Sequence, residues 1–251
     1  MTDFSIEDAK PAELVALINL ILYGDPGVGK TTFALQAPNP IVIRTEDGLG
    51  NSGAQTFPIC QSWDDFKSQM KVLAKEEHSF KTLVIDSLDH LEPLIIAAVL
   101  AENNKETLNF DFGEGYRQVT VKWQLALNML SYLRKKRGMH TIMIAHSQKR
   151  KQEDPGMEAY DKTMLKLTRQ GQSLLIESVD MVLYAHFYRR LQQEGDGKNV
   201  RYFMADSDRR VLSTIDTGSA LAKNRFNLPA QLPLDWHQLV AAIESGKPTE
   251  S

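Results

Sequence analysis

Cysteine, long apolar runs and targeting signals are scarce in this sequence, and each scarcity excludes a class of protein. The 251 residues contain one cysteine, Cys60, so a secreted disulfide-linked scaffold is excluded. The longest apolar runs, at 14–23 and 91–101, are interrupted or too short to cross a bilayer. The first ten residues are acidic and lack the basic, then apolar, order of a secretion signal. We therefore expect a soluble cytoplasmic protein without a membrane partner.

Net charge is also small. The chain carries 29 Lys and Arg residues against 32 Asp and Glu residues, a formal net charge of −3, so the total charge does not indicate a nucleic-acid partner. The basic residues nevertheless form four clusters in the C-terminal half, at 134–137, 149–151, 189–190 and 209–210. Because a local basic strip binds phosphates even on a weakly acidic protein, such a partner is not excluded.

The order of apolar patterns predicts the fold class. Short apolar runs alternate with longer segments of helical periodicity, which is typical of an α/β domain with a mostly parallel central sheet flanked by helices. The predicted strands cover 17–23, 41–44, 82–85, 141–145 and 181–187. The predicted helices cover 30–36, 64–77, 87–103 with a bend or restart at Pro93, and a segment around 119–133 that ends before Gly138. We expect one domain over 1–251 with a flexible tail at 246–251.

Two stretches lack clear periodicity, 104–115 and 147–169. The second is polar, contains Pro155 and Gly156, and is longer than ordinary connections between elements. We therefore expect it to be a functional or mobile loop. Two strand-like runs near the end, 200–205 and 210–215, predict a C-terminal β-hairpin.

Residues 24–31, with the sequence GDPGVGKT, match the phosphate-binding motif G-x-x-x-x-G-K-[ST] in full. They follow a predicted strand and open a predicted helix, the setting that this motif requires. In such a loop backbone N–H groups turn toward phosphate oxygens, Lys30 reaches the β- and γ-phosphates, and Thr31 ligates Mg²⁺. The sequence therefore predicts that ATP and Mg²⁺ are bound by Gly24, Asp25, Pro26, Gly27, Val28, Gly29, Lys30, Thr31 and Thr32.

Two acidic residues follow predicted strands. Asp86 ends the run 82–85, where a carboxylate beside the phosphate loop would share Mg²⁺ with Thr31. Glu46 follows the strand 41–44, directly after the helix that the phosphate loop opens. The alternative interpretation of Glu46 is a solvated loop acid, like its neighbour Asp47.

With these motifs in this order, the chain resembles the RecA-like P-loop ATPases. It looks most like the phage nucleotide-binding (AAA-domain) proteins that act as single-strand annealing recombinases. The resemblance covers about 17–229 and implies that Glu46 activates the attacking water. The chain departs from full-length bacterial RecA because it has no separate N-terminal oligomerisation domain and no large C-terminal domain, which puts long filaments in doubt.

The resemblance assigns further roles. His146 or Gln148 would sense the γ-phosphate, with both alternatives open, and Lys223 and Arg225 would reach into the ATP site of a neighbouring subunit. The segment 147–169 takes the place of a DNA-binding loop, in which Tyr160 would offer a base-stacking surface. The predicted DNA-binding residues are Lys149, Arg150, Lys151, Tyr160, Lys162, Lys166 and Arg169. The alternative interpretation of this segment is a surface loop of mixed charge.

The resemblance implies a DNA-dependent or DNA-stimulated ATPase that binds single-stranded DNA and promotes annealing or strand exchange in phage homologous recombination. The implied partners are single-stranded DNA, further copies of the chain with ATP at the subunit interfaces, and a single-strand binding protein, all in the host cytoplasm. Two other functions remain open. One is a RecA-fold motor or loader acting on a protein or on duplex DNA, and the other is a P-loop small-molecule kinase.

Overall fold

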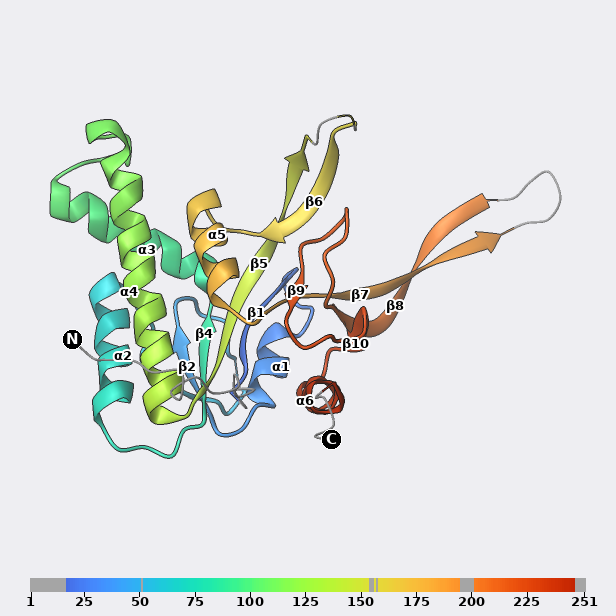
Figure 1. Cartoon of the computed structure of the whole chain (residues 1–251), viewed down its shortest axis with the longest axis horizontal. Coiled ribbons are helices and arrows are strands. Elements are labelled where there is room, and N and C mark those ends of the chain that lie inside the picture. Colours follow the sequence, from blue (N-terminus) through green and yellow to red (C-terminus); the bar gives the residue numbers. More distant parts are fainter. Residues whose placement is uncertain (1–16, 51, 154–155, 157, 195–200, 247–251) are drawn as a thin grey trace, which may run out of the picture.

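The computed structural model describes residues 17–50, 52–153, 156, 158–194 and 201–246, and for 189–194 and 201–207 it describes the backbone only. A twisted sheet runs through the molecule in the order β10-β8-β7-β1-β5-β4-β2-β3, with β6 paired to β5 and β9 paired to β7 (Figure 1). The strands are β1 (Asn19–Gly24), β2 (Pro40–Arg44), β3 (Gln55–Thr56), β4 (Thr82–Asp86), β5 (His140–Gln152), β6 (Tyr160–Leu165), β7 (Met181–Glu194), β8 (Arg201–Ser213), β9 (Lys223–Asn224) and β10 (Gln231–Pro233).

Helices cover both faces of this sheet. They are α1 (Lys30–Leu35), α2 (Trp63–Lys75), α3 (Leu88–Asn103), α4 (Glu114–Arg137), α5 (Arg169–Ser178) and α6 (Trp236–Ser245), with a 3₁₀ turn η2 (Asp111–Gly113) before α4. Successive side chains of a strand point to opposite faces, so β1 contributes side chains to two hydrophobic cores, one on each face of the sheet. Ile21 and Tyr23 pack with α2, α3, α4 and α5, whereas Leu20 and Leu22 pack with α1 and α6.

The parallel pairing of the central strands confirms the predicted fold class. β1 pairs in parallel with β5 and with β7, and β4 pairs in parallel with β5 and with β2. The carboxyl ends of these strands therefore meet at one edge, which is where ligands bind in open α/β sheets. The phosphate loop, Asp86 and His146 all lie at or directly beyond this edge.

Two predicted segments differ from the structure in the same way. The expected loop 147–169 is a β-hairpin, in which β5 continues to Gln152 and pairs with β6, after which Thr168 caps α5. The run 201–213 is one strand, β8, whose hairpin partner is β7, so 201–205 and 210–213 do not pair with each other. Both hairpins extend beyond the sheet (Figure 1). In these projecting hairpins a strand can continue through polar residues, because solvent is available on both faces of a two-stranded ribbon.

Pro93 does not interrupt α3, contrary to the predicted bend or restart. The helix begins after Ser87 and runs without a break to Asn103. A proline removes one i to i−4 hydrogen bond, here the bond to the carbonyl of Asp89. Because Pro93 is exposed on the helix surface, its ring faces solvent and not a packed neighbour. The predicted tail at 246–251 lies outside the described residues beyond Gly246.

A buried carboxylate joins three helices on one face of the sheet. Glu92 of α3 is 6% exposed and accepts hydrogen bonds from Trp123 Nε1 of α4 at 3.3 Å and from the N and Oγ1 of Thr168, each at 2.8 Å. Thr168 is also the N-cap of α5, where its Oγ1 accepts from the Gly171 N at 3.2 Å. Glu92 therefore fixes the point where the β5–β6 hairpin returns to the helical layer.

We predict that Glu92→Ala lowers the free energy of unfolding by about 2–3 kcal/mol, because it leaves buried donors without an acceptor. Urea denaturation would measure the change. Glu102→Ala is the matched control on the same helix, since Glu102 is 56% exposed and pairs with Lys122 of α4 at 2.7 Å. Loss of that surface pair should cost less than about 1 kcal/mol. Equal losses in the two variants would contradict the role given to Glu92.

Candidate nucleotide-binding and catalytic site

The phosphate loop joins β1 to α1 and depends on its glycines. The backbone of Gly24 lies so close to β7 that a Cβ atom there would collide with the carbonyl oxygen of Ala185. Gly27 and Gly29 have φ angles of 77° and 103°, in the left-handed region that glycine adopts without steric cost. Gly29 is also the N-cap residue of α1, so the backbone N–H groups that open this helix point into the loop.

Lys30 is held over its own loop. Its Nζ donates to the carbonyl oxygens of Gly24 at 2.9 Å and Asp25 at 3.0 Å. Burial lowers the pKa of Lys30, and the nearby carboxylates of Asp86, Asp89 and Glu46 oppose that shift. The ammonium group is therefore placed in advance where phosphate oxygens would meet the loop.

Thr31 and Asp86 face each other, as the sequence predicts for a magnesium site. Thr31 Oγ1 donates to Asp86 Oδ2 at 2.8 Å. Burial raises the pKa of Asp86, and the hydrogen bond from Thr31 acts against that rise. Two oxygen ligands from neighbouring elements are a suitable donor set for Mg²⁺, which takes few protein ligands and keeps its remaining positions for water and phosphate.

The end of β2 is tied to the end of β4 through Thr45. Thr45 N donates to the Asp86 carbonyl at 2.8 Å, its Oγ1 donates to the Ser87 carbonyl at 2.7 Å, and the Ser87 N donates to that same Oγ1 at 2.8 Å. Glu46 follows directly, and its Oε2 lies 3.2 Å from His90 Nδ1 in α3. The carboxylate predicted to activate water is therefore positioned by contacts on both sides.

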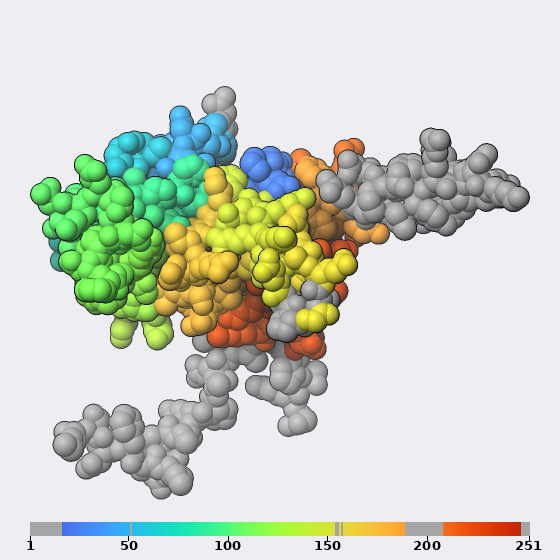
Figure 2. All heavy atoms as spheres, turned by 90° about the horizontal axis from the view of Figure 1, so that it is seen from above, coloured from blue at the N-terminus to red at the C-terminus, as the bar shows by residue number. Residues whose placement is uncertain are grey.

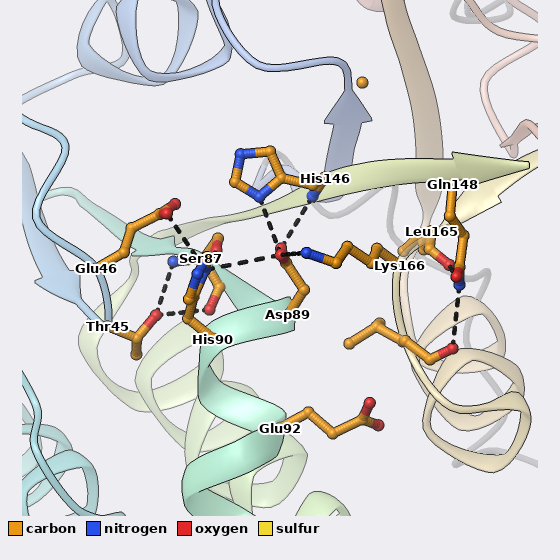
Figure 3. Close-up of polar contacts among 12 residues, drawn as sticks. Thr45, Glu46, Ser87, Asp89, His90, Glu92, His146, Gln148, Leu165 and Lys166 are labelled. Atoms are coloured by element: carbon orange, nitrogen blue, oxygen red, sulfur yellow. Dashed lines mark hydrogen bonds and ion pairs between the residues drawn. The ribbon is translucent and has the colours of Figure 1, made fainter.

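Asp89 holds the strand that carries His146 (Figure 3). Its Oδ1 accepts from the His146 backbone N, and its Oδ2 accepts from His146 Nδ1, both at 2.9 Å. Burial works against ionisation of Asp89, but the hydrogen bonds from His146 outweigh it and hold the pKa of Asp89 at about 2. The same hydrogen bond raises the pKa of His146. The pair therefore keeps Asp89 ionised as the acceptor of both N–H groups of His146.

These groups surround a cavity of about 370 Å³ whose lining includes Lys30, Thr31, Glu46, Asp86, His146 and Arg210. Of the two sensor candidates, His146 lines this cavity. The amide of Gln148 instead donates to the Leu165 carbonyl at 2.7 Å, within the β5–β6 hairpin.

Arg210 is a member of this site that the sequence reasoning did not assign. In the sequence, Arg210 stands out only as a member of the basic cluster at 209–210. Because β8 pairs with β7 beside the phosphate loop, Arg210 lies over the ring of Phe187 at 5.7 Å and its guanidinium approaches Gly29. The signal in the sequence was too weak to find it, since nothing there showed that 201–213 is a single strand.

Lys223 and Arg225 lie near the amino ends of the central strands, whereas the phosphate loop of the same chain lies at their carboxyl ends. Lys223 Nζ donates to the carbonyls of Ile176 and Val179 at 2.7 and 2.9 Å, at the C-terminal end of α5. Arg225 pairs with Asp180 at 3.2 Å. Within one chain, these two cations therefore stabilise the α5–β7 connection, and their action on a neighbouring subunit stays a prediction.

The predicted DNA-binding residues divide into two groups. Lys149 and Lys151 of β5 and Arg169 at the start of α5 are exposed. The side chains of the other cations have partners within the chain: Arg150 donates to the Leu167 carbonyl, Lys162 pairs with Asp216 at 2.6 Å, and Lys166 Nζ lies 3.9 Å from Asp89 Oδ2. Tyr160 is half-buried in β6, opposite Gln152.

Comparisons with known proteins identify the family of the chain. Residues 17–226 match a family model described as an AAA domain. The chain belongs to this AAA-domain family of P-loop ATPase type. It is also 25% identical over 220 residues to the SPbeta prophage-derived uncharacterized protein YorG of Bacillus subtilis (strain 168). The match covers 83% of this chain but only 59% of that relative, so the chain spans little more than half of the relative's length. Among the described residues, no helix is long and apolar enough to cross a membrane.

We predict that Lys30→Ala abolishes ATP hydrolysis, because it removes the positive charge that faces the phosphates. The fold should survive, since the hydrogen bonds of Lys30 within the described part of the chain go to the carbonyls of its own loop. Steady-state phosphate release would measure the activity and circular dichroism the fold. Turnover at the wild-type rate in a folded Lys30→Ala protein would disprove the assignment of the phosphate loop.

A second prediction concerns Arg210. Arg210→Ala should lower the rate of ATP hydrolysis about 10²-fold, the usual loss when one group that stabilises developing charge is removed. Arg209→Ala is the matched control, because Arg209 is the adjacent cation of β8 and lies over the ring of Tyr188 at 5.4 Å. The control should keep wild-type turnover. The assignment would be wrong if the two variants lost activity equally.

Proposed function

We propose that this AAA-domain ATPase binds single-stranded DNA along its β5–β6 hairpin and promotes annealing or strand exchange in phage homologous recombination. ATP binding and hydrolysis would reset its affinity for DNA. The observation that carries this proposal is the continuity of β5, a single strand that leaves the phosphate cavity at His146 and continues into the hairpin that exposes Lys149 and Lys151.

The surface beside the hairpin suits a nucleic-acid backbone. A cavity of about 820 Å³ lies between the hairpin and α5, and its charged lining residues are Arg150, Lys151 and Arg169 together with Glu153 and Glu177, a surplus of one positive charge. Figure 2 shows the hairpin (yellow) and the following α5 segment (gold) side by side on one face of the molecule. Burial lowers the pKa of Arg150, and the nearby Arg169 acts in the same direction. An incoming phosphate would relieve the repulsion between these two cations.

The chemistry proposed for the phosphate cavity uses residues already in place. Lys30 and the loop N–H groups would hold the phosphates, and Thr31 and Asp86 would hold Mg²⁺, which supplies charge neutralisation when bound. Glu46 would orient and deprotonate the attacking water. Arg210 would face the charge that develops on the phosphoryl group from within the same chain.

The prophage origin of the relative is compatible with a phage function, although that relative is itself uncharacterized. We further propose a homo-oligomer with ATP at the subunit interfaces. In such an assembly Lys223 and Arg225 would leave their partners at the C-terminal end of α5 and reach a neighbour's cavity. A single-strand binding protein is a further proposed partner.

The experiment for this proposal measures single-strand affinity as a function of salt. Affinity in the presence of ATP should fall with a log–log slope of about −0.7 per phosphate contacted. Lys149→Ala/Lys151→Ala should flatten that slope by about 1.4, because both side chains are exposed on the hairpin. Arg150 is left intact, since its guanidinium is bonded to the Leu167 carbonyl and its loss would disturb the hairpin itself.

Lys135→Ala/Lys136→Ala is the matched control, with two exposed cations at the end of α4. It should keep both the affinity and the slope of the wild type. If the control flattened the slope and the hairpin variant did not, the basic end of α4 would be the DNA site. If the wild type failed to bind single strands at low salt with ATP present, a RecA-fold ATPase acting on a protein partner would be the better account.

A further inference from the structure

Three side chains with metal-ligating atoms converge beside the phosphate cavity (Figure 3). They are Glu46, which follows β2, His90 in the first turn of α3, and His146 in β5. One ligand atom from each residue lies within 4.8 Å of those of the other two. The residues are 44 and 56 positions apart in the sequence, so the sheet, and no local motif, brings them together.

The distances suit one shared ion. Two ligands that each lie about 2.0–2.1 Å from a tetrahedral ion are about 3.3 Å apart. Glu46 Oε2 and His90 Nδ1 are separated by 3.2 Å, and a bound ion would replace the contact of that same nitrogen with Ser87 Oγ at 2.9 Å. The His90 and His146 rings meet edge to face with centroids 5.9 Å apart. Small side-chain rotations would therefore complete a three-ligand set.

The buried carboxylate of Asp89 is hydrogen-bonded to the imidazole of His146. Asp89, whose side chain is 1% exposed, accepts a hydrogen bond from His146 Nδ1 at 2.9 Å. This contact leaves Nε2 of His146 for coordination. Histidine ligands of metals almost always donate their other ring N–H to such a partner, which fixes the ring and raises the basicity of the ligand nitrogen. Asp89 thus orients His146 as a second-sphere carboxylate does in metal sites.

We propose that Glu46, His90 and His146 bind a divalent transition-metal ion of the zinc and cobalt class. Two imidazole nitrogens and one carboxylate suit these ions, whereas Mg²⁺ prefers oxygen ligands such as those of Thr31 and Asp86. Three protein ligands leave at least one coordination position open, as in catalytic zinc sites. Because Glu46 and His146 also line the phosphate cavity, the open position faces that cavity. The site goes beyond the proposed function and requires neither nucleotide nor DNA.

The single cysteine of the chain does not compete for the ion. The single cysteine, Cys60, is buried, and its thiol lies 3.4 Å from Gln69 Oε1. Burial raises the pKa of Cys60 to about 11, so it would not supply a thiolate at neutral pH. Among the other histidines, His237 is exposed on α6 and provides a control.

The test is a titration of tag-free, chelator-stripped full-length protein with Co²⁺, followed by absorption of the bound ion, and with Zn²⁺, followed by calorimetry, both without nucleotide. Wild type and His237→Ala should bind one ion at this site with equal affinity, whereas Lys30→Ala should bind it more tightly, because a positive charge near Glu46 and His146 is removed. His90→Ala and Glu46→Gln, which remove direct ligands, should bind at least about 10²-fold more weakly, and Asp89→Asn about 10- to 10²-fold more weakly. Circular dichroism would check that each variant is folded.

Absence of Co²⁺ and Zn²⁺ binding in the wild type would overturn the proposal. So would wild-type affinity in folded His90→Ala and Glu46→Gln proteins. Failure of the metal site is distinguishable from failure of the proposed DNA-binding function, because no arm of this titration contains DNA or ATP. Retained or tighter binding by Lys30→Ala would separate this site from the phosphate loop itself.

Discussion

The contact between Asp89 and His146 is the interaction on which the rest of the site depends. One buried carboxylate accepts both the backbone N–H and the ring N–H of His146, and it lies on the first turn of the helix that follows Asp86. The phosphate cavity and β5 are therefore joined as one unit. Lys166 closes the arrangement, because its N donates to the His146 carbonyl at 2.9 Å and its Nζ approaches Asp89. The residue that follows β6 is therefore joined by one hydrogen bond to His146, which lines the phosphate cavity.

Such a joint offers a physical route for the proposed coupling between nucleotide and DNA. Coupling between two sites requires an element whose arrangement both ligands bias. His146 would be that element, since its ring lines the phosphate cavity and its backbone belongs to the strand that carries Lys149 and Lys151. Glu92 fixes the far side of the same segment at Thr168. A change at the cavity would therefore move the hairpin relative to α5, whose N-terminal end Glu92 holds in place.

Much of the fold and the core of the nucleotide site could be predicted from the sequence. Buried parallel strands have continuous apolar runs, and the phosphate-loop motif fixes its own strand–loop–helix setting, so the regions of β1, β2, β4 and the facing pair Thr31 and Asp86 were found. The hairpins were missed because their strands project from the sheet and carry polar residues that resemble loops. Arg210 was missed for the same reason. The convergence of Glu46, His90 and His146 depends on strand order, which no local pattern encodes.

The measurement that tests the central claim most directly compares single-strand affinity in two nucleotide states of one protein. Glu46→Gln should bind ATP and Mg²⁺ but hydrolyse ATP slowly, since an amide cannot accept the proton of the attacking water. Its dissociation constant for a single-stranded oligonucleotide would be measured at fixed salt with ATP and then with ADP. The account predicts at least about a tenfold difference between the two states, a coupling free energy of about 1.4 kcal/mol. Equal affinities, with both nucleotides shown to be bound, would contradict it.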